Sequence, residues 1–205
     1  MPLIKTIIDR NQMKTILKIL GLMLLMVSCN TQNKKDNTVD ETVKMGKTVQ
    51  DLAKQSQDLK ETEPVSEETL NNWFPKTLQG MERQKIVKGT LTGYGISGAT
   101  ATYEGSDKSR LVVNVNDGAG EKGTMLTSQY IAFKNLNTDM ETDTKSEKIL
   151  NNNTMLGVET VYKTEGKVMI NFLYKDRFAV NMQADNIEKQ AVWDAFDQLD
   201  IEALF

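Results

Sequence analysis

Histidine is absent from this chain of 205 residues, which removes the commonest general base and the commonest metal ligand. Catalysis by a Ser-His-Asp or Cys-His arrangement is therefore excluded. A zinc site would need carboxylates alone, because cysteine occurs only once. The sequence accordingly predicts a protein that is not an enzyme, with no catalytic residue, no metal site and no cofactor.

A surplus of positive charge is also lacking. The chain has 25 lysines and arginines against 28 aspartates and glutamates. Residues 1–28 carry four basic groups and one acidic group, so residues 29–205 have a net charge of −6. Phosphate backbones are bound by positive surfaces, so this balance excludes nucleic acid as a predicted partner.

Long apolar runs are missing apart from one near the N-terminus. Lys14 and Lys18 precede an apolar stretch over residues 19–27, and Ser28 separates that stretch from Cys29. A basic start, a short apolar run and a small residue are the parts of a secretory signal peptide. The run is shorter than the roughly 20 residues that span a bilayer. Asp9 does not suit a basic leader, so translation is predicted to start at Met13 rather than Met1.

The segment Met26-Val27-Ser28-Cys29 resembles the lipobox of bacterial lipoproteins. The resemblance implies that residues 1–28 are a lipoprotein signal peptide and that Cys29 is acylated and becomes the first residue of the mature chain. Acyl chains would then anchor the protein in the cell envelope. In such lipoproteins of Gram-negative cells, an aspartate directly after the cysteine implies retention at the inner membrane. This chain has Asn30 at that position, so the resemblance points to the outer membrane in a Gram-negative cell. The alternatives are a buried thiol in a core helix and an uncleaved signal anchor.

Residues 29–65 are predicted to be a spacer that contains one weak helix. Residues 30–38 are polar and charged, which is typical of a flexible segment. Residues 39–60 place apolar side chains near helical spacing, although Gly46 weakens the helix. This helix is interpreted either as a solvated linker or as a short coiled-coil contact with a partner. Pro64 ends it.

Residues 66–205 are predicted to form one globular domain. Short alternating segments are followed by turn residues, and helical patterns lie near both ends of the domain. Strands in runs with few helices predict an α+β fold, here an antiparallel sheet of about six or seven strands. The predicted strands cover residues 83–91, 96–103, 111–116, 141–150, 158–162, 167–174 and 177–184, and the predicted helices cover 66–74, 124–136 and 187–199. Ser66 is predicted to cap the first helix and Asp185 or Asn186 the last, and Lys175 with Asp176 is predicted to form a tight hairpin. Predicted apolar contacts come from Trp73 and Phe74 in the core and from one face of the 124–136 helix, which carries Leu126, Tyr130 and Phe133.

Two motifs suggest ligands at first sight. Residues 118–123 match G-x-G-x-x-G between a predicted strand and a predicted helix, but no βαβ unit follows, so nucleotide binding is rejected. An anion held by amides at the start of the 124–136 helix stays open as an alternative. Asn114, Asn116 and Asp117 suggest a calcium loop, but their spacing does not fit the known frame and calcium is not predicted.

The carboxylates are scattered along the chain. Glu141, Asp143, Glu159 and Asp176 are interpreted as solvated surface charges. The alternative function is a carboxylate-based envelope hydrolase that uses Glu141 and Glu159, which requires two carboxyl groups about 5 to 9.5 Å apart. Arg177 is predicted to pair with Asp176 or with a helix terminus.

Three parts of the domain resemble a functionally uncharacterised group of bacterial envelope proteins. The segments are residues 70–80 (LNNWFPKTLQG), 101–105 with 113–118 (ATYEG and VNVNDG), and 176–182 with 200–204 (DRFAVNM and DIEAL). The resemblance covers about residues 66–205 and implies no catalytic residues. The function predicted from the sequence is therefore a lipid-anchored envelope protein with a non-enzymatic domain that binds an envelope protein or a small ligand.

Overall fold

The computed structural model describes residues 54, 56–89, 91–136 and 138–205. Contacts divide the chain into two units, Met1–Val49 and Gln50–Phe205, and every described residue lies in the second. The predicted signal peptide, Cys29 and most of the spacer lie outside the described residues. Of the spacer, residues 56–61 are helical.

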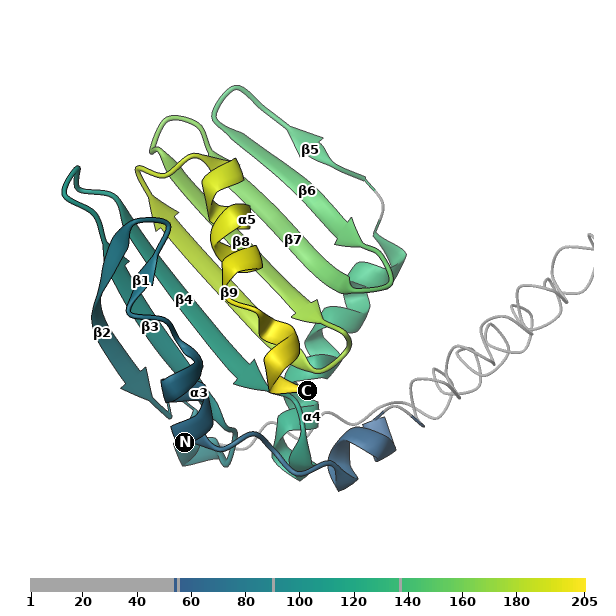
Figure 1. Cartoon of the computed structure of the whole chain (residues 1–205). Helices are drawn as coiled ribbons and strands as arrows, with labels where there is room; N and C mark the ends of the chain where they lie inside the picture. The colour runs from purple at the N-terminus through teal and green to yellow at the C-terminus, as the bar shows by residue number, and fades with distance from the viewer. Residues whose placement is uncertain (1–53, 55, 90, 137) are drawn as a thin grey trace, which may run out of the picture. The chain divides into compact units, whose positions relative to one another are not determined.

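A single antiparallel sheet of nine strands forms the centre of the domain, in the order β1-β2-β3-β4-β9-β8-β7-β6-β5 (Figure 1). The predicted antiparallel sheet is confirmed, but the predicted number of six or seven strands is wrong. The strands are β1 (Thr77–Leu78), β2 (Met81–Lys88), β3 (Gly98–Glu104), β4 (Arg110–Asp117), β5 (Met140–Glu141), β6 (Lys145–Asn151), β7 (Met155–Tyr162), β8 (Lys167–Tyr174) and β9 (Phe178–Asp185).

Two short strands account for the difference in number. β1 has two residues, too few for an alternating pattern to be visible in a sequence. The predicted strand over residues 141–150 is in fact β5 and β6, because the Thr142 amide donates to the Lys145 carbonyl at 2.8 Å and turns the chain back. Both short strands lie at the edges of the sheet, where a short strand limits pairing with other chains.

The helical elements are α3 (Glu67–Trp73), η1 (Thr92–Tyr94), α4 (Gly120–Ser128), η2 (Gln129–Asn135), α5 (Lys189–Gln198) and η3 (Ile201–Leu204). The predicted cap of the first of these is confirmed, since the Ser66 side chain accepts from the Thr69 amide at 3.0 Å. Residues 124–136 are not one helix, because α4 starts earlier and tightens into the 3-10 element η2. Glu188 occupies the N-cap position of α5 without a side-chain capping hydrogen bond, so the predicted cap at Asp185 or Asn186 is wrong. Asp185 is the last residue of β9, and Asn186 takes a left-handed turn with φ 56°.

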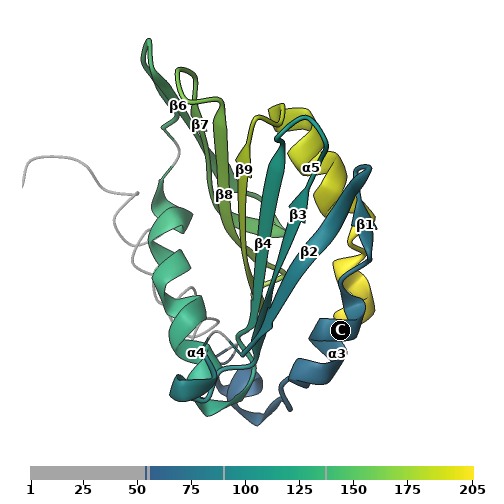
Figure 2. The ribbon, with the colours of Figure 1, turned by 90° about the vertical axis from the view of Figure 1, so that its left-hand side faces the viewer.

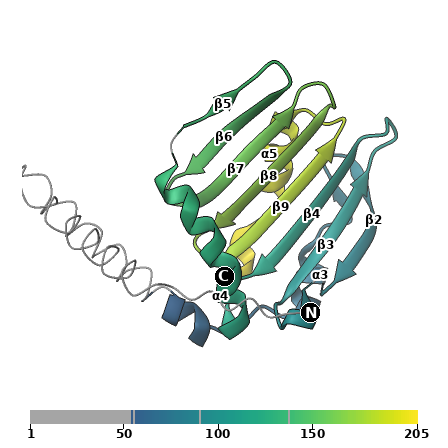
Figure 3. The ribbon, with the colours of Figure 1, turned by 180° about the vertical axis from the view of Figure 1, so that it is seen from behind.

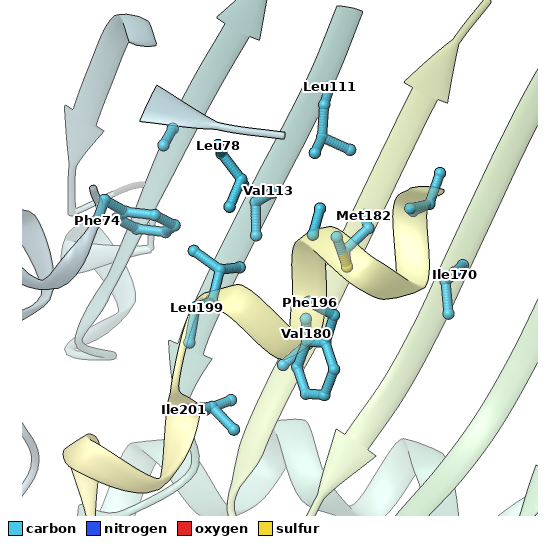
Figure 4. Packing of buried hydrophobic residues seen from close by; sticks show 14 of the residues in the cluster. Phe74, Leu78, Leu111, Val113, Ile170, Val180, Met182, Phe196, Leu199 and Ile201 are labelled. Atoms are coloured by element: carbon cyan, nitrogen blue, oxygen red, sulfur yellow. The ribbon is translucent and has the colours of Figure 1, made fainter. Parts of the chain in front are cut away.

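Helices cover the two faces of the sheet unequally (Figure 2). α3 and α5 lie on one face and bury the main core there. Figure 4 shows Phe196 of α5 and Leu199, the residue that follows α5, among side chains that point from the sheet, including Val180 and Met182. Phe172 in β8 is fully buried and meets Phe196 edge-on, with ring centroids 5.0 Å apart. Phe74 is also in this core, as predicted.

α4 and η2 cross the opposite face of the sheet (Figure 3), where they cover a smaller core. Leu126, Tyr130 and Phe133, which were predicted to share one apolar helix face, pack against strand residues there. The strand residues of this second core are Leu156, Leu173 and Ala179. Farther along the same face, Asn114, Asn181 and Asn171 lie side by side on β4, β9 and β8. This face is therefore apolar beneath α4 and η2 and amide-lined beyond them.

Two buried tyrosines predict that the domain loses stability in alkali. Burial raises the pKa of Tyr103, whose hydroxyl donates to the Pro75 carbonyl at 3.0 Å, to about 12. Burial and the hydrogen bond to Glu202 likewise raise the pKa of Tyr174 to about 12. Because the folded-state pKa lies above the unfolded value of 10.0, folding favours the protonated form of each tyrosine. The resulting contribution to the free energy of unfolding is complete below pH 10 and is lost as the pH rises towards 12. Urea unfolding between pH 9 and pH 11.5 is expected to show this fall.

The matched test removes one hydroxyl. Tyr103→Phe is expected to reduce the slope of the free energy of unfolding against pH by the contribution of about one ionising group. The contribution of Tyr174 is expected to remain. A slope that is the same in Tyr103→Phe as in the unchanged protein would contradict the assignment to Tyr103.

Candidate functional site

The end of the sheet where β4 passes into α4 brings together several residues that the sequence had singled out. Asp117, the last residue of β4, is completely buried, and the Arg177 side chain is 13% exposed. Arg177 donates from Nε to Oδ1 and from Nη2 to Oδ2 of Asp117, both at 2.8 Å. The guanidinium also lies over the ring of Phe178, 4.9 Å from its centroid. This two-bond pairing is the strong geometry of an arginine–carboxylate contact.

The same carboxylate holds the segment that leads into the domain. The Val65 amide donates to Asp117 Oδ2 at 2.8 Å, and the Ala119 amide donates to Oδ1 at 2.9 Å. Ser97 donates from its hydroxyl to the Val65 carbonyl and accepts from the Asp117 amide through its own carbonyl. We call Val65, Ser97, Asp117 and Arg177 the clamp. It joins the entering chain to the central strands β4 and β9.

The clamp corrects one sequence prediction and explains two others. Arg177 pairs with Asp117, not with Asp176 or with a helix terminus. Four donors already engage the two oxygens of Asp117, which leaves this carboxylate little capacity for calcium. The other prediction concerned an anion at the start of the helix. The dipole of α4 favours a negative charge at its N-terminus, and the Asp117 carboxylate supplies one by accepting from the Ala119 amide.

The glycine motif of residues 118–123 serves packing. The Gly118 amide donates to the Arg177 carbonyl at 2.9 Å, which joins the start of the loop to the turn between β8 and β9. A Cβ at Gly123 would lie 2.6 Å from the Gly118 carbonyl carbon and 2.8 Å from the Asp117 carbonyl oxygen. Glycine at position 123 therefore allows α4 to lie directly against the backbone at the end of β4.

The two carboxylates of the hydrolase hypothesis each have a separate cation. Glu141 is exposed in β5 and pairs with Lys163. Glu159 is 5% exposed in β7, accepts from Trp193 Nε1 at 2.7 Å and pairs with Lys189 at 3.2 Å. Neither lines the groove described next. Within the described part of the chain, no three acidic or cysteine side chains are grouped so that they could hold a metal ion.

An apolar groove opens between η1 and α4, near the clamp. It has a volume of about 750 Å³. The rim has two large apolar side chains that point into solvent, since Tyr94 is 74% exposed and Met125 is 69% exposed. Ile96, 7% exposed, and the half-buried Leu126 lie deeper. The residues that line the groove are Leu91, Gly93, Tyr94, Gly95, Ile96, Lys122, Met125, Leu126 and Gln129.

Glycine shapes the η1 side of the groove. Gly95 ends η1 with φ 73°, a left-handed conformation that glycine adopts without strain. A Cβ at Gly95 would lie 3.3 Å from Cγ of Lys122, so the stem of this lysine passes close over the glycine. The Thr92 hydroxyl binds Glu67 of α3, which ties η1 to the body of the domain. The groove therefore belongs to an anchored part of the fold.

Sequence reasoning missed this groove. The predicted helix was assigned an apolar face that contained Leu126, and Met125 lies outside that face. An apolar residue on the solvent side of a helix is a visible signal of a contact surface. Tyr94 had no such signal, because it lies in a glycine-rich turn that carries no periodic pattern.

In comparison with known proteins, no family model, no curated protein and no solved structure matches the chain. Among the described helices, none combines the length and the apolar character that crossing a bilayer requires.

Proposed function

We propose that the chain is a lipid-anchored lipoprotein of the cell envelope, and that its domain is a non-enzymatic binding module. The observation that carries the binding role is the groove between η1 and α4, with Tyr94 and Met125 exposed on its rim. Large exposed apolar side chains that gather at a concavity are typical of a ligand or protein contact. The partner is an envelope protein or a small ligand.

The lining of the groove supports binding rather than catalysis. Among the described residues that line it, Lys122 is the one side chain charged at neutral pH, and Tyr94 is the one other ionisable group. General acid–base catalysis needs a group that titrates near the working pH and lies within reach of the substrate. The side chains of the groove supply apolar surface instead. The hydrolase alternative is supported less, because Glu141 and Glu159 are each held by a separate lysine.

The anchor is supported by the sequence of residues 13–29, with its basic start, short apolar run and cysteine after a small residue. Several acyl chains hold a protein stably to a membrane, whereas a single chain holds it only marginally. Localisation in the outer membrane follows from Asn30 if the cell is Gram-negative. In this proposal the spacer carries the domain and its groove away from the lipid surface.

Mass spectrometry of the full-length protein extracted from its own envelope tests the anchor. The expected mass is that of residues 29–205 plus acyl chains, because in this proposal the chain is cleaved before Cys29 and Cys29 is acylated. A Cys29→Ser variant is expected to lack the acyl mass. An unmodified mass that begins at Met1 or Met13 would contradict the lipoprotein proposal.

A further inference from the structure

We infer that the groove between η1 and α4 binds a long-chain fatty acid, with the alkyl chain along the apolar lining and the carboxylate at Lys122. The inference rests on the proposed binding role of this groove and names the class of its ligand. Three features carry it: the apolar character of the lining, the position of the lysine and the scarcity of polar groups that a peptide would use.

The lining suits an alkyl chain. Leu91, Tyr94, Ile96, Met125 and Leu126 supply aliphatic, aromatic and thioether surface. A volume of about 750 Å³ lies within the usual range for small-molecule sites. Methionine has an unbranched, flexible side chain that adapts to chains of different shape. The groove is open to solvent along one side, which lets one end of a long ligand reach water.

The charge of the groove selects the head of the ligand. Lys122 lies at the rim with its stem over Gly95, and it makes no ion pair with any residue that the structure describes. No aspartate or glutamate lines the groove among the described residues. A lone ammonium beside apolar surface complements a ligand with an anionic head and an apolar tail. A cationic head would be repelled by this lysine, and a neutral head could gain only a hydrogen bond from it.

An extended peptide fits the groove less well. An extended peptide pairs its backbone with a free strand edge, and this groove is bordered by a 3-10 turn and an α-helix. Apart from Lys122, the polar side chains of the lining are the Gln129 amide and the Tyr94 hydroxyl. An extended peptide would leave most of its backbone groups without partners against this surface.

Photo-crosslinking of the full chain in phosphatidylcholine vesicles tests the inference. The probe is a 16-carbon fatty acid with a diazirine in the chain, and the matched probe has a trimethylammonium head on the same chain. Labelled peptides are located by tandem mass spectrometry. The fatty acid is expected to label the segments 91–96 and 122–129, and the ammonium probe is expected to label them less.

Two exposed positions supply the variants, and each has a control elsewhere on the domain. Lys122→Gln is expected to reduce fatty-acid labelling about threefold to fivefold, the size of one exposed charge contact. Lys148→Gln, which removes a charge from the exposed side of β6, is expected to change nothing. Met125→Asp is expected to abolish labelling of the groove by both probes, and Met140→Asp, at another exposed methionine, is expected to leave it intact.

The outcomes separate the ligand class from the groove itself. If both probes label the groove equally and Lys122→Gln has no effect, the fatty acid is the wrong ligand. In that case, loss of labelling in Met125→Asp would still support the groove as a binding surface. Labelling that persists in Met125→Asp would overturn both the fatty acid and the groove.

Discussion

Asp117→Asn is expected to lower the free energy of unfolding by about 3–5 kcal/mol, the cost of breaking a buried ion pair from one side. Asparagine has nearly the volume of aspartate but no charge. The Arg177 guanidinium, 13% exposed, would remain in place without its counter-charge. The amide group can also accept at only one of the two oxygen positions, so donors from Val65, Ala119 and Arg177 would compete for it.

Urea unfolding followed by tryptophan fluorescence measures the effect. The matched control is Asp185→Asn, since Asp185 pairs with Arg110 at 3.7 Å on an exposed part of the sheet. The control is expected to cost less than about 1 kcal/mol. Adding Arg177→Met to Asp117→Asn is expected to recover part of the loss, because it removes the uncompensated charge. If Asp117→Asn costs no more than the control, the clamp does not stabilise the fold.

The same variant is expected to loosen the entry of the chain into the domain. The Val65 amide loses its charged acceptor in Asp117→Asn, so its hydrogen exchange should become faster than in the unchanged protein. The Tyr103 amide, within the β2–β3–β4 sheet, serves as the internal reference. Unchanged exchange at Val65 would mean that the clamp does not hold the entering segment.

Gly123→Ala is the second large prediction, with an expected loss of about 2–3 kcal/mol, at the upper end of the cost of overpacking. The new Cβ would lie 2.6 to 2.8 Å from backbone atoms of Asp117 and Gly118. Backbone atoms cannot turn aside as the end of a side chain can, so α4 must move from the sheet. The helix propensity of alanine is more favourable than that of glycine by about 1 kcal/mol, which offsets only part of this cost.

Gly93→Ala provides the control for the glycine prediction. A Cβ at Gly93 meets no described atom within 4 Å, and this glycine does not have a positive φ. Its substitution is expected to change the free energy of unfolding by less than about 0.5 kcal/mol. Thermal unfolding of the two variants compares them directly. Equal stability of Gly123→Ala and Gly93→Ala would show that α4 does not need its close approach to β4.

Local features of the fold could be predicted where short-range chemistry decides them. The Ser66 cap needs only a hydroxyl followed by a first helical turn. The tight hairpin at Lys175 and Asp176 is confirmed, since both residues have positive φ and the Arg177 amide donates to the Tyr174 carbonyl at 3.0 Å. β8 and β9 were predicted nearly to the residue because one face of each is fully buried, which produces alternation over most of each strand.

The boundaries that failed depend on contacts outside each segment. β1 exists because Thr77 and Leu78 pair with Glu82 and Met81. Asp139 accepts from the Ile149 amide at 2.9 Å beside β5, a contact between residues ten positions apart that no periodic pattern reveals. Edge strands with exposed residues lack the alternation that buried strands show, so their number could not be read from the sequence.

By itself, the sequence determined the antiparallel sheet, its longest strands and the exclusion of histidine chemistry, because composition and alternation act over a few residues. Only the tertiary structure decided the two sites. Asp117 and Arg177 are 60 residues apart, and they meet because β4 pairs with β9 in a register that places Asp117 opposite Phe178. The groove likewise joins residues 91–96 to residues 122–129 across two strands. Such contacts between residues distant in the sequence follow from strand order and register, which short-range patterns do not specify.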